Sequence, residues 1–234
     1  MLPHAPRQNI KELLASLHAN FGNNLQNPDP TIIPLFDDID HNSRVIDGIR
    51  TELLAGYCGT DGQKKICAEL LDEVFTDFTI AMYLLGVGLI VPARMSVRRA
   101  LEVGVATVYM WDLPHEYWGW RQCDTDLSFS NMITHLNSIG YLAYLSSVVG
   151  GDSKICDPSH FQQFYRKLSN TVHGKLQGLP PLSPERFTAE KNGIADHLQI
   201  TIDVQKALIN LLYGRFDGLK IEIEKAFPRP GGKK

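Results

Sequence analysis

The stretch GVGLIVPARMSVRRALEVGVATVYMWDLP, residues 86–114, indicates the fold class. Gly86 and Gly88 interrupt an apolar helical pattern that precedes them. Pro92 then stands where a proline is tolerated, in the first turn of a new helix. The new pattern runs with a period of 3.6 residues as far as Pro114. Two long helical patterns joined by a short glycine turn predict an antiparallel helical pair.

The segments on both sides of this pair carry the same helical period, and none shows convincing strand alternation. Helices are expected at about 10–21, 42–57, 61–85, 126–139, 158–174 and 193–227. The last of these is expected to break near Gly214 or Gly218, and a short aromatic helix or turn is expected at 115–122. The sequence therefore predicts an all-α protein, an antiparallel helical bundle with extra N- and C-terminal helices.

The composition fits one globular domain, because 44% of the 234 residues are hydrophobic and 21% are charged. We expect a single all-α domain over residues 1–234. Its expected parts are N-terminal helices at 1–60, a helical core at 61–176, C-terminal helices at 177–228 and a disordered tail at 229–234.

The charge and hydropathy patterns exclude several classes of function. The formal net charge is -3, so no global positive field attracts nucleic acid, and any such contact must be local. The most apolar run, residues 80–91, is shorter than the roughly 20 residues of a bilayer span. We expect a cytoplasmic protein without a membrane partner. No cofactor motif is present, and the acidic run DDIDH at 37–41 fits helix capping better than a metal site, so neither cofactor nor metal is expected.

The segment FYRKLSNTVHGK, residues 164–175, separates polar and apolar side chains on a helical wheel at about 100° per residue. One face carries groups that can hold a phosphate: Arg166, Ser169, Asn170 and His173. The opposite face is apolar: Phe161, Phe164, Tyr165, Leu168 and Val172. By itself this pattern fits the solvated face of any surface helix.

The same segment, with six residues between Arg166 and His173, resembles the Arg-x(4–6)-His signature of HEPN domains. HEPN domains are small all-α bundles that include toxin, defence and CRISPR-associated ribonucleases. A second segment, RRALEVGVATVYMW at 98–111, is similar to the Arg-x-x-x-Glu helix that precedes this histidine in several HEPN groups. The resemblance implies that residues 61–176 form a HEPN-like core.

Catalytic members of the family cleave RNA without a metal, by attack of the 2′-hydroxyl on the adjacent phosphate. The resemblance thus implies an endoribonuclease of a bacterial defence or toxin system. His173 would be the general acid and base, because imidazole titrates near neutrality. Arg166 would be the phosphate clamp, because its planar charge is permanent. Supporting or substrate-binding roles fall to Asn170, Ser169, Lys167, Arg98 and Glu102.

The resemblance also implies partners. The Cα atoms of Arg166 and His173 are separated by about 10.5 Å along a helix, and family members complete such a site by pairing two copies. We therefore expect a homodimer that binds RNA and pairs with an antitoxin or another defence-system protein. Lys167, however, stands where active members usually carry Asn, Asp or His. The alternative is a non-catalytic HEPN-like module that binds RNA or protein.

Two further groups of residues allow two interpretations each. Arg98 and Glu102 are one turn apart, so they form either an exposed ion pair or a wall of the cleft in which Glu102 orients an arginine or His173 and Arg98 adds positive charge. An aromatic group could stack on bases, but it more simply fills a core or an interface: Tyr109, Trp111, Tyr117, Trp118 and Trp120.

Overall fold

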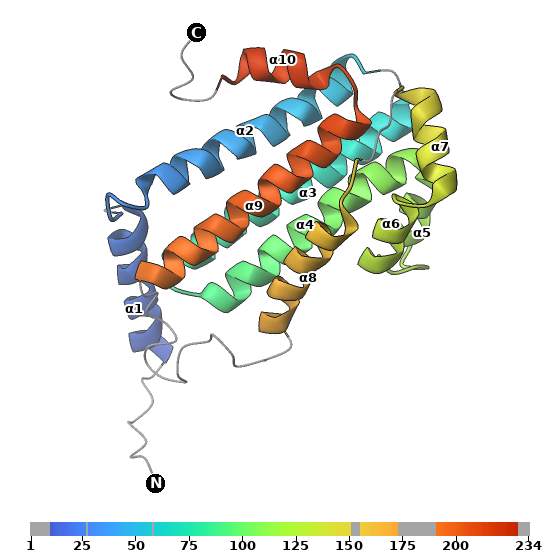
Figure 1. Cartoon of the computed structure of the whole chain (residues 1–234). Helices are drawn as coiled ribbons and strands as arrows, with labels where there is room; N and C mark the ends of the chain where they lie inside the picture. Colours follow the sequence, from blue (N-terminus) through green and yellow to red (C-terminus); the bar gives the residue numbers. More distant parts are fainter. Residues whose placement is uncertain (1–9, 27, 58, 151–154, 173–190, 229–234) are drawn as a thin grey trace.

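A computed structural model describes residues 10–26, 28–57, 59–150, 155–172 and 191–228. Within these ranges the chain forms helices and turns and contains no strand, which confirms the all-α prediction (Figure 1). The predicted tail at 229–234 lies outside the described residues.

Four long helices form a closed ring around the main core: α2 (Ile33–Ala55), α3 (Asp61–Gly86), α4 (Ile90–Asp112) and α9 (Lys191–Arg215). In this ring α2 packs against α3 and α9, and α4 packs against the same two helices. Figure 1 shows the four running side by side. The arrangement is a four-helix bundle, whose apolar faces meet in its centre.

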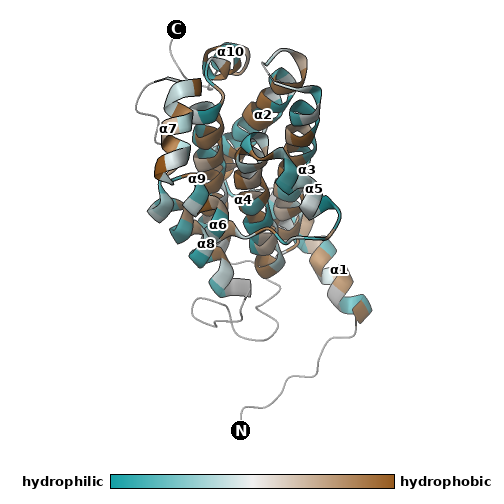
Figure 2. Cartoon of the chain, turned by 90° about the vertical axis from the view of Figure 1, so that its right-hand side faces the viewer, coloured by the Kyte–Doolittle hydropathy of each residue, from teal (hydrophilic) through white to brown (hydrophobic). Residues whose placement is uncertain are grey.

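The remaining helices cover the outside of the ring. α8 (Pro158–Val172) lies mainly against α4, and α10 (Leu219–Ala226) crosses α2. Three short helices follow α4 along the chain: α5 (Pro114–Arg121), α6 (Phe129–His135) and α7 (Ile139–Val148). α1 (Ile10–Phe21) and the π-helical turn Gly22–Gln26 contact α3. In Figure 2, α4 is flanked by α3 and α5 on one side and by α6 and α8 on the other.

The predicted antiparallel pair is formed by α3 and α4, and its ends follow from local signals. α3 begins after Thr60, whose Oγ1 accepts a hydrogen bond from the backbone N–H of Gln63 at 3.2 Å. The Gln63 side chain in turn accepts from the N–H of Thr60, which completes a capping box. After α3, Gly88 has a φ of 89°, a value that favours glycine. The chain can therefore reverse within three residues.

Two predicted boundaries are wrong. α2 begins at Ile33, well before residue 42, so the acidic run 37–41 lies inside the helix and does not cap it. Pro34 occupies the first turn, which is the start signal of this helix. The helix predicted over 126–139 is shorter, because α6 begins after Ser128, whose hydroxyl caps it, and ends at His135. α7, capped by the hydroxyl of Ser138, begins where the predicted helix ends and was not predicted.

A buried ion pair joins the C-terminal ends of α4 and α9. Arg215 donates two hydrogen bonds to the carboxylate of Asp112, from Nε at 2.9 Å and from Nη2 at 2.5 Å. Each of the two side chains is only 4% exposed. The hydroxyl of Tyr141 donates to the same carboxylate at 2.9 Å, which also attaches α7 to the bundle.

α4 and α9 approach each other closely at Gly104. A Cβ atom at this position would lie 2.6 Å from Cδ2 of the buried Leu208. We expect Gly104→Ala to lower the free energy of unfolding by about 1–3 kcal/mol, because the added methyl group overpacks the interface. Denaturant unfolding measures the change. Gly140→Ala is the control, since nothing lies within 4 Å of its Cβ position; equal losses in the two variants would contradict the prediction.

Candidate functional site

The exposed face of α8 carries three of the predicted site residues. The apolar face of the predicted wheel is buried at Phe161, Phe164 and Leu168. Arg166, Lys167 and Asn170 are exposed on the other side. For these six residues the structure separates the two faces of α8 as the sequence predicted.

Two predicted site residues stand apart from this exposed group. Ser169 is 8% exposed, and its Oγ has no hydrogen-bond partner in the described part of the chain. The expectation that its side chain lies on the open polar face is wrong, because Ser169 is buried next to the apolar residue Leu168. His173 lies outside the described residues, so its position relative to Arg166 stays a prediction.

Arg166 differs from the other arginines in the described chain. It forms no hydrogen bond or ion pair with any other residue there. The others each interact with a carboxylate: Arg44, Arg50, Arg94, Arg98, Arg99, Arg121 and Arg215. Arg166 therefore keeps an uncompensated positive charge on the surface of α8.

Arg98 connects α4 to α8. Its Nε donates to Glu102 Oε1 at 3.1 Å, which confirms the predicted ion pair. Its Nη2 donates to the hydroxyl of Tyr165 at 2.6 Å, and its guanidinium lies 4.5 Å from the centroid of that ring. The Tyr165 ring stacks on Phe129 of α6 at 4.4 Å. Arg98 thus fixes the residue that directly precedes Arg166.

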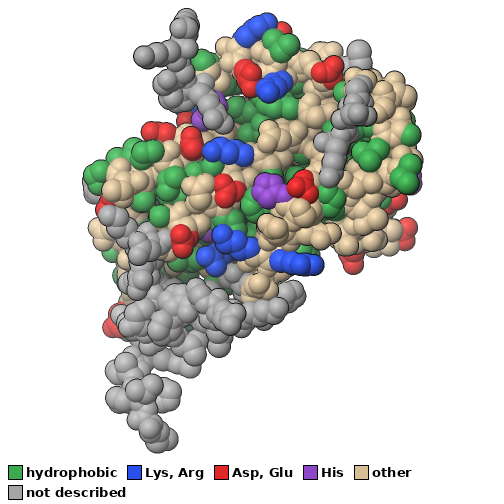
Figure 3. Space-filling model, viewed as in Figure 1, with side chains coloured by type: hydrophobic (Ala, Val, Ile, Leu, Met, Phe, Trp, Pro, Cys, Tyr) green, Lys and Arg blue, Asp and Glu red, His purple; other side chains and the backbone are tan. Residues whose placement is uncertain are grey.

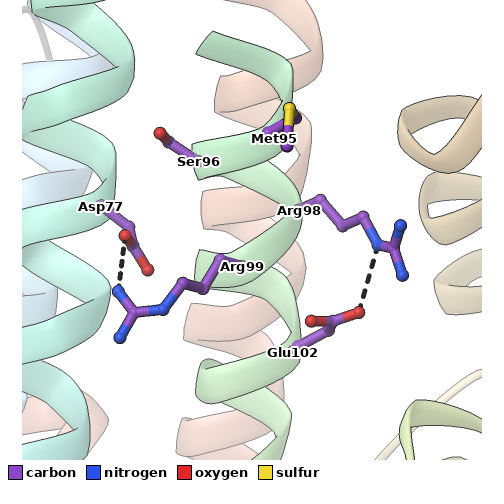
Figure 4. A pocket seen from close by; sticks show the side chains of 6 residues that line it. All are labelled: Asp77, Met95, Ser96, Arg98, Arg99 and Glu102. Atoms are coloured by element: carbon purple, nitrogen blue, oxygen red, sulfur yellow. Dashed lines mark hydrogen bonds and ion pairs between the residues drawn. The ribbon is translucent and has the colours of Figure 1, made fainter. Parts of the chain in front are cut away.

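Arg99 forms a second set of ion pairs that the sequence analysis missed. Its Nη1 donates to Asp77 at 2.8 Å and its Nη2 to Glu73 at 2.5 Å, both on α3. Burial raises the pKa of Asp77, although the hydrogen bond from Arg99 opposes this effect. The signal in the sequence was the four-residue spacing of Glu73 and Asp77, which places both on one side of α3. Arg98 and Arg99 point to opposite sides of α4 in Figure 4.

A shallow depression of about 350 Å³ lies on the outer face of α4. Its lining comes from α3 and α4: Asp77, Met95, Ser96, Arg98, Arg99 and Glu102 (Figure 4). Met95 is 47% exposed, so part of the wall is apolar. Arg98 forms one side of the depression and also donates to the hydroxyl of Tyr165, so the same side chain contacts both the depression and α8.

The aromatic group serves mainly as core. Trp111 and Tyr117 are each 3% exposed, while Tyr109 and Trp120 pack partly buried against the core. Trp118 is 54% exposed. The core interpretation therefore holds for most of the group.

The described surface mixes charges of both signs. Figure 3 shows acidic and basic side chains interspersed over one face. In the described ranges, no cluster of three or more His, Cys, Asp or Glu side chains is arranged to hold a metal ion. None of the helices in the described chain has both the length and the hydropathy needed to cross a membrane. Because the surface charges are mixed, any electrostatic attraction of an anionic ligand would depend on a few residues such as Arg166.

His197 of α9 is a buried histidine whose ring forms no hydrogen bond with any described residue. Its side chain is fully buried, and neither ring nitrogen has a partner among the described residues. Burial, together with the smaller effect of the nearby charge of Arg94, lowers its pKa to about 3. The imidazole is therefore neutral in the folded protein at neutral pH.

We expect this histidine to make the protein less stable in acid. In the unfolded chain it takes up a proton near pH 6.5, whereas in the folded protein the pKa is about 3. Between these values the unfolded state binds more protons, so the free energy of unfolding falls as the pH falls, by about 2 kcal/mol at pH 5. Urea unfolding at pH 7 and pH 5 measures the loss, which His197→Leu should reduce. An identical pH dependence in the variant would contradict this origin.

The comparisons with known proteins give no relative for this fold and surface. No family model matches the chain, and neither does any curated protein or solved structure. The resemblance to HEPN domains thus stays a prediction, based on residues 98–111 and 164–174.

Proposed function

We propose that the chain is a HEPN-like, metal-independent endoribonuclease of a bacterial defence or toxin system. The observation that carries the proposal is the exposed guanidinium of Arg166, which has no carboxylate partner within the described chain. Such a group keeps its full charge and its N–H donors for a phosphate oxygen. Arg166 binds the scissile phosphate, and His173 transfers the protons.

The reaction needs an imidazole and a guanidinium, which the sequence segment 164–175 supplies in His173 and Arg166. The imidazole of His173 accepts the proton of the RNA 2′-hydroxyl, whose oxygen then attacks the adjacent phosphorus. Negative charge builds up on the phosphate oxygens, where Arg166 stabilises it. The 5′-oxygen leaves with a proton, which produces a 2′,3′-cyclic phosphate and a 5′-hydroxyl. Lys167 and Asn170 add a charge and an amide group to the same exposed face.

Arg98 and Glu102 act in this proposal as positioning residues. Their ion pair fixes Tyr165, and Tyr165 sets the rotation of α8 beside α4. Two copies of the chain bring their α8 faces together, so that each Arg166 serves a site completed by the other copy. Sedimentation velocity of the pure protein tests this dimer, and a monomer at every concentration would contradict it.

The test of the reaction is the chemistry of the RNA ends. Mixed RNA is incubated with pure protein in EDTA, and the products are examined for 2′,3′-cyclic phosphates. We expect cyclic phosphate ends and 5′-hydroxyls. The nuclease proposal would be contradicted if the RNA remained intact although the protein is dimeric, its partner protein has been added and no antitoxin is present. Product ends that carry 3′-hydroxyls would also contradict it.

A second candidate is a non-catalytic HEPN-like module that binds RNA or a partner protein. The observation that favours it is Lys167, which is exposed beside Arg166 and likewise has no acidic partner in the described chain. Two adjacent free cations bind a phosphate backbone without any proton transfer. Recovery of intact RNA with the wild-type protein but not with Arg166→Ala would support this function. Equal recovery of RNA with the wild type and with Arg166→Ala would contradict it.

A further inference from the structure

We infer that the depression on the outer face of α4 holds a nucleobase of single-stranded RNA. The inference rests on the proposed function, since it concerns the RNA that this function acts on. It adds a second binding surface, on α4, to the phosphate-binding face of α8.

The size and the lining of the depression fit a planar ring. Its volume of about 350 Å³ lies at the small end of ligand sites, which suits one base but not a large ligand. Met95 supplies a partly exposed thioether, a polarisable group that packs well on aromatic rings. The guanidinium groups of Arg98 and Arg99 lie on opposite sides of the depression, and either one offers a flat surface on which a base can stack.

The charges in the depression favour a base over a phosphate. The lining contains two arginines and two carboxylates, and both arginines are already paired: Arg98 with Glu102, and Arg99 with Asp77. A phosphate would meet two carboxylates and no unpaired positive charge there. A neutral ring avoids this repulsion and still accepts hydrogen bonds from guanidinium N–H groups that the carboxylates leave free.

A buried acceptor at the edge of the depression points to a ligand with an N–H group. Asp77 is 3% exposed, and its Oδ2 accepts no hydrogen bond from any described residue. Figure 4 shows one oxygen of Asp77 directed to Arg99 and the other turned toward α4. The N–H edge of a base would supply the missing donor.

Arg98 links the depression to α8, the helix that carries Arg166. Arg98 forms its wall on the α8 side and donates to Tyr165, the residue before Arg166. An RNA strand whose phosphate lies on Arg166 therefore has a neighbouring base beside Arg98. The RNA strand is therefore bound at two places, by a phosphate on α8 and by a base on α4.

The experiment removes one base at a time from the RNA. The full chain carrying His173→Ala is mixed in EDTA with a short labelled RNA, either intact or with a single abasic position, and affinity is measured by fluorescence anisotropy. One abasic position is expected to weaken binding by about 5- to 100-fold. With Met95→Ala added, the penalty at that position should shrink to about twofold or less. Ile221→Ala, which removes an exposed side chain of α10, is the matched control and should keep the full penalty.

The outcomes separate this inference from the nuclease. Equal affinity for intact and abasic RNA, or an undiminished penalty in a folded Met95→Ala protein, overturns the base site. Circular dichroism verifies the fold of each variant. If the wild type cleaves RNA but an abasic position does not weaken RNA binding, the base site is overturned and the nuclease proposal is supported. A clear abasic penalty that depends on Met95, without cleavage, overturns the nuclease and supports the base site.

Discussion

His173→Ala is expected to slow RNA cleavage by about 10²- to 10⁴-fold. The reason is that the variant has no group at this position to take the proton from the 2′-hydroxyl or to return one to the leaving oxygen. Initial rates of cyclic phosphate formation near pH 7, in EDTA, measure the effect. Because Arg166 is retained, RNA binding should remain close to that of the wild type.

The matched control is His160→Ala. His160 is an exposed histidine of α8, and its ring lies 4.4 Å from that of Phe164. Its loss removes an imidazole from α8 but leaves the proposed proton transfer unchanged. A similar loss of activity in both variants, or full activity in His173→Ala, would contradict the role of His173.

Asp112→Asn is expected to lower the free energy of unfolding by about 3–5 kcal/mol. The substitution keeps the shape of the side chain but removes its charge, and so leaves the guanidinium of Arg215 buried without a counter-ion. The two side chains are each 4% exposed, so water cannot replace the lost partner. Chemical denaturation followed by circular dichroism measures the loss.

Two controls separate charge burial from a general loss of contacts. The double variant Asp112→Leu with Arg215→Met removes both charges and should be more stable than Asp112→Asn. Arg44 and Asp40 form an exposed pair, with side chains 65% and 63% exposed, so Asp40→Ala should cost less than about 1 kcal/mol. A double variant less stable than the single one would contradict the account.

The sequence predicted those parts of the fold that depend on neighbouring residues. α3 and α4 were recognised because Gly88 and Pro92 lie next to the helix ends that they define. The early start of α2 was missed, because its signal is a single proline at Pro34 and an acidic run was taken for a cap. α6 was predicted too long and α7 was missed, because the capping serines Ser128 and Ser138 were taken as interior residues of one helix that ends at 139.

The candidate site was predictable only as far as one helix determines it. The wheel placed Arg166 and Asn170 on the open face, but it could not tell which side the neighbouring helices cover, and Ser169 is buried. The bond from Arg98 to Tyr165 joins residues 67 positions apart, so it arises from packing. Arg166 has no carboxylate partner among the described residues, and this also follows from how the neighbouring helices pack rather than from the sequence of α8 alone.

The central place of α4 gives the two halves of the proposed RNA surface different local stabilities. α4 packs against α3, α9, α8, α5 and α6, whereas α8 lies outside the ring and leans mainly on α4. Amide hydrogens of α4 should therefore exchange with solvent only when the whole domain unfolds, while those of α8 exchange through a smaller, local opening. The base-binding half is a rigid reference, and the phosphate-binding half can detach from it and dock again without global unfolding.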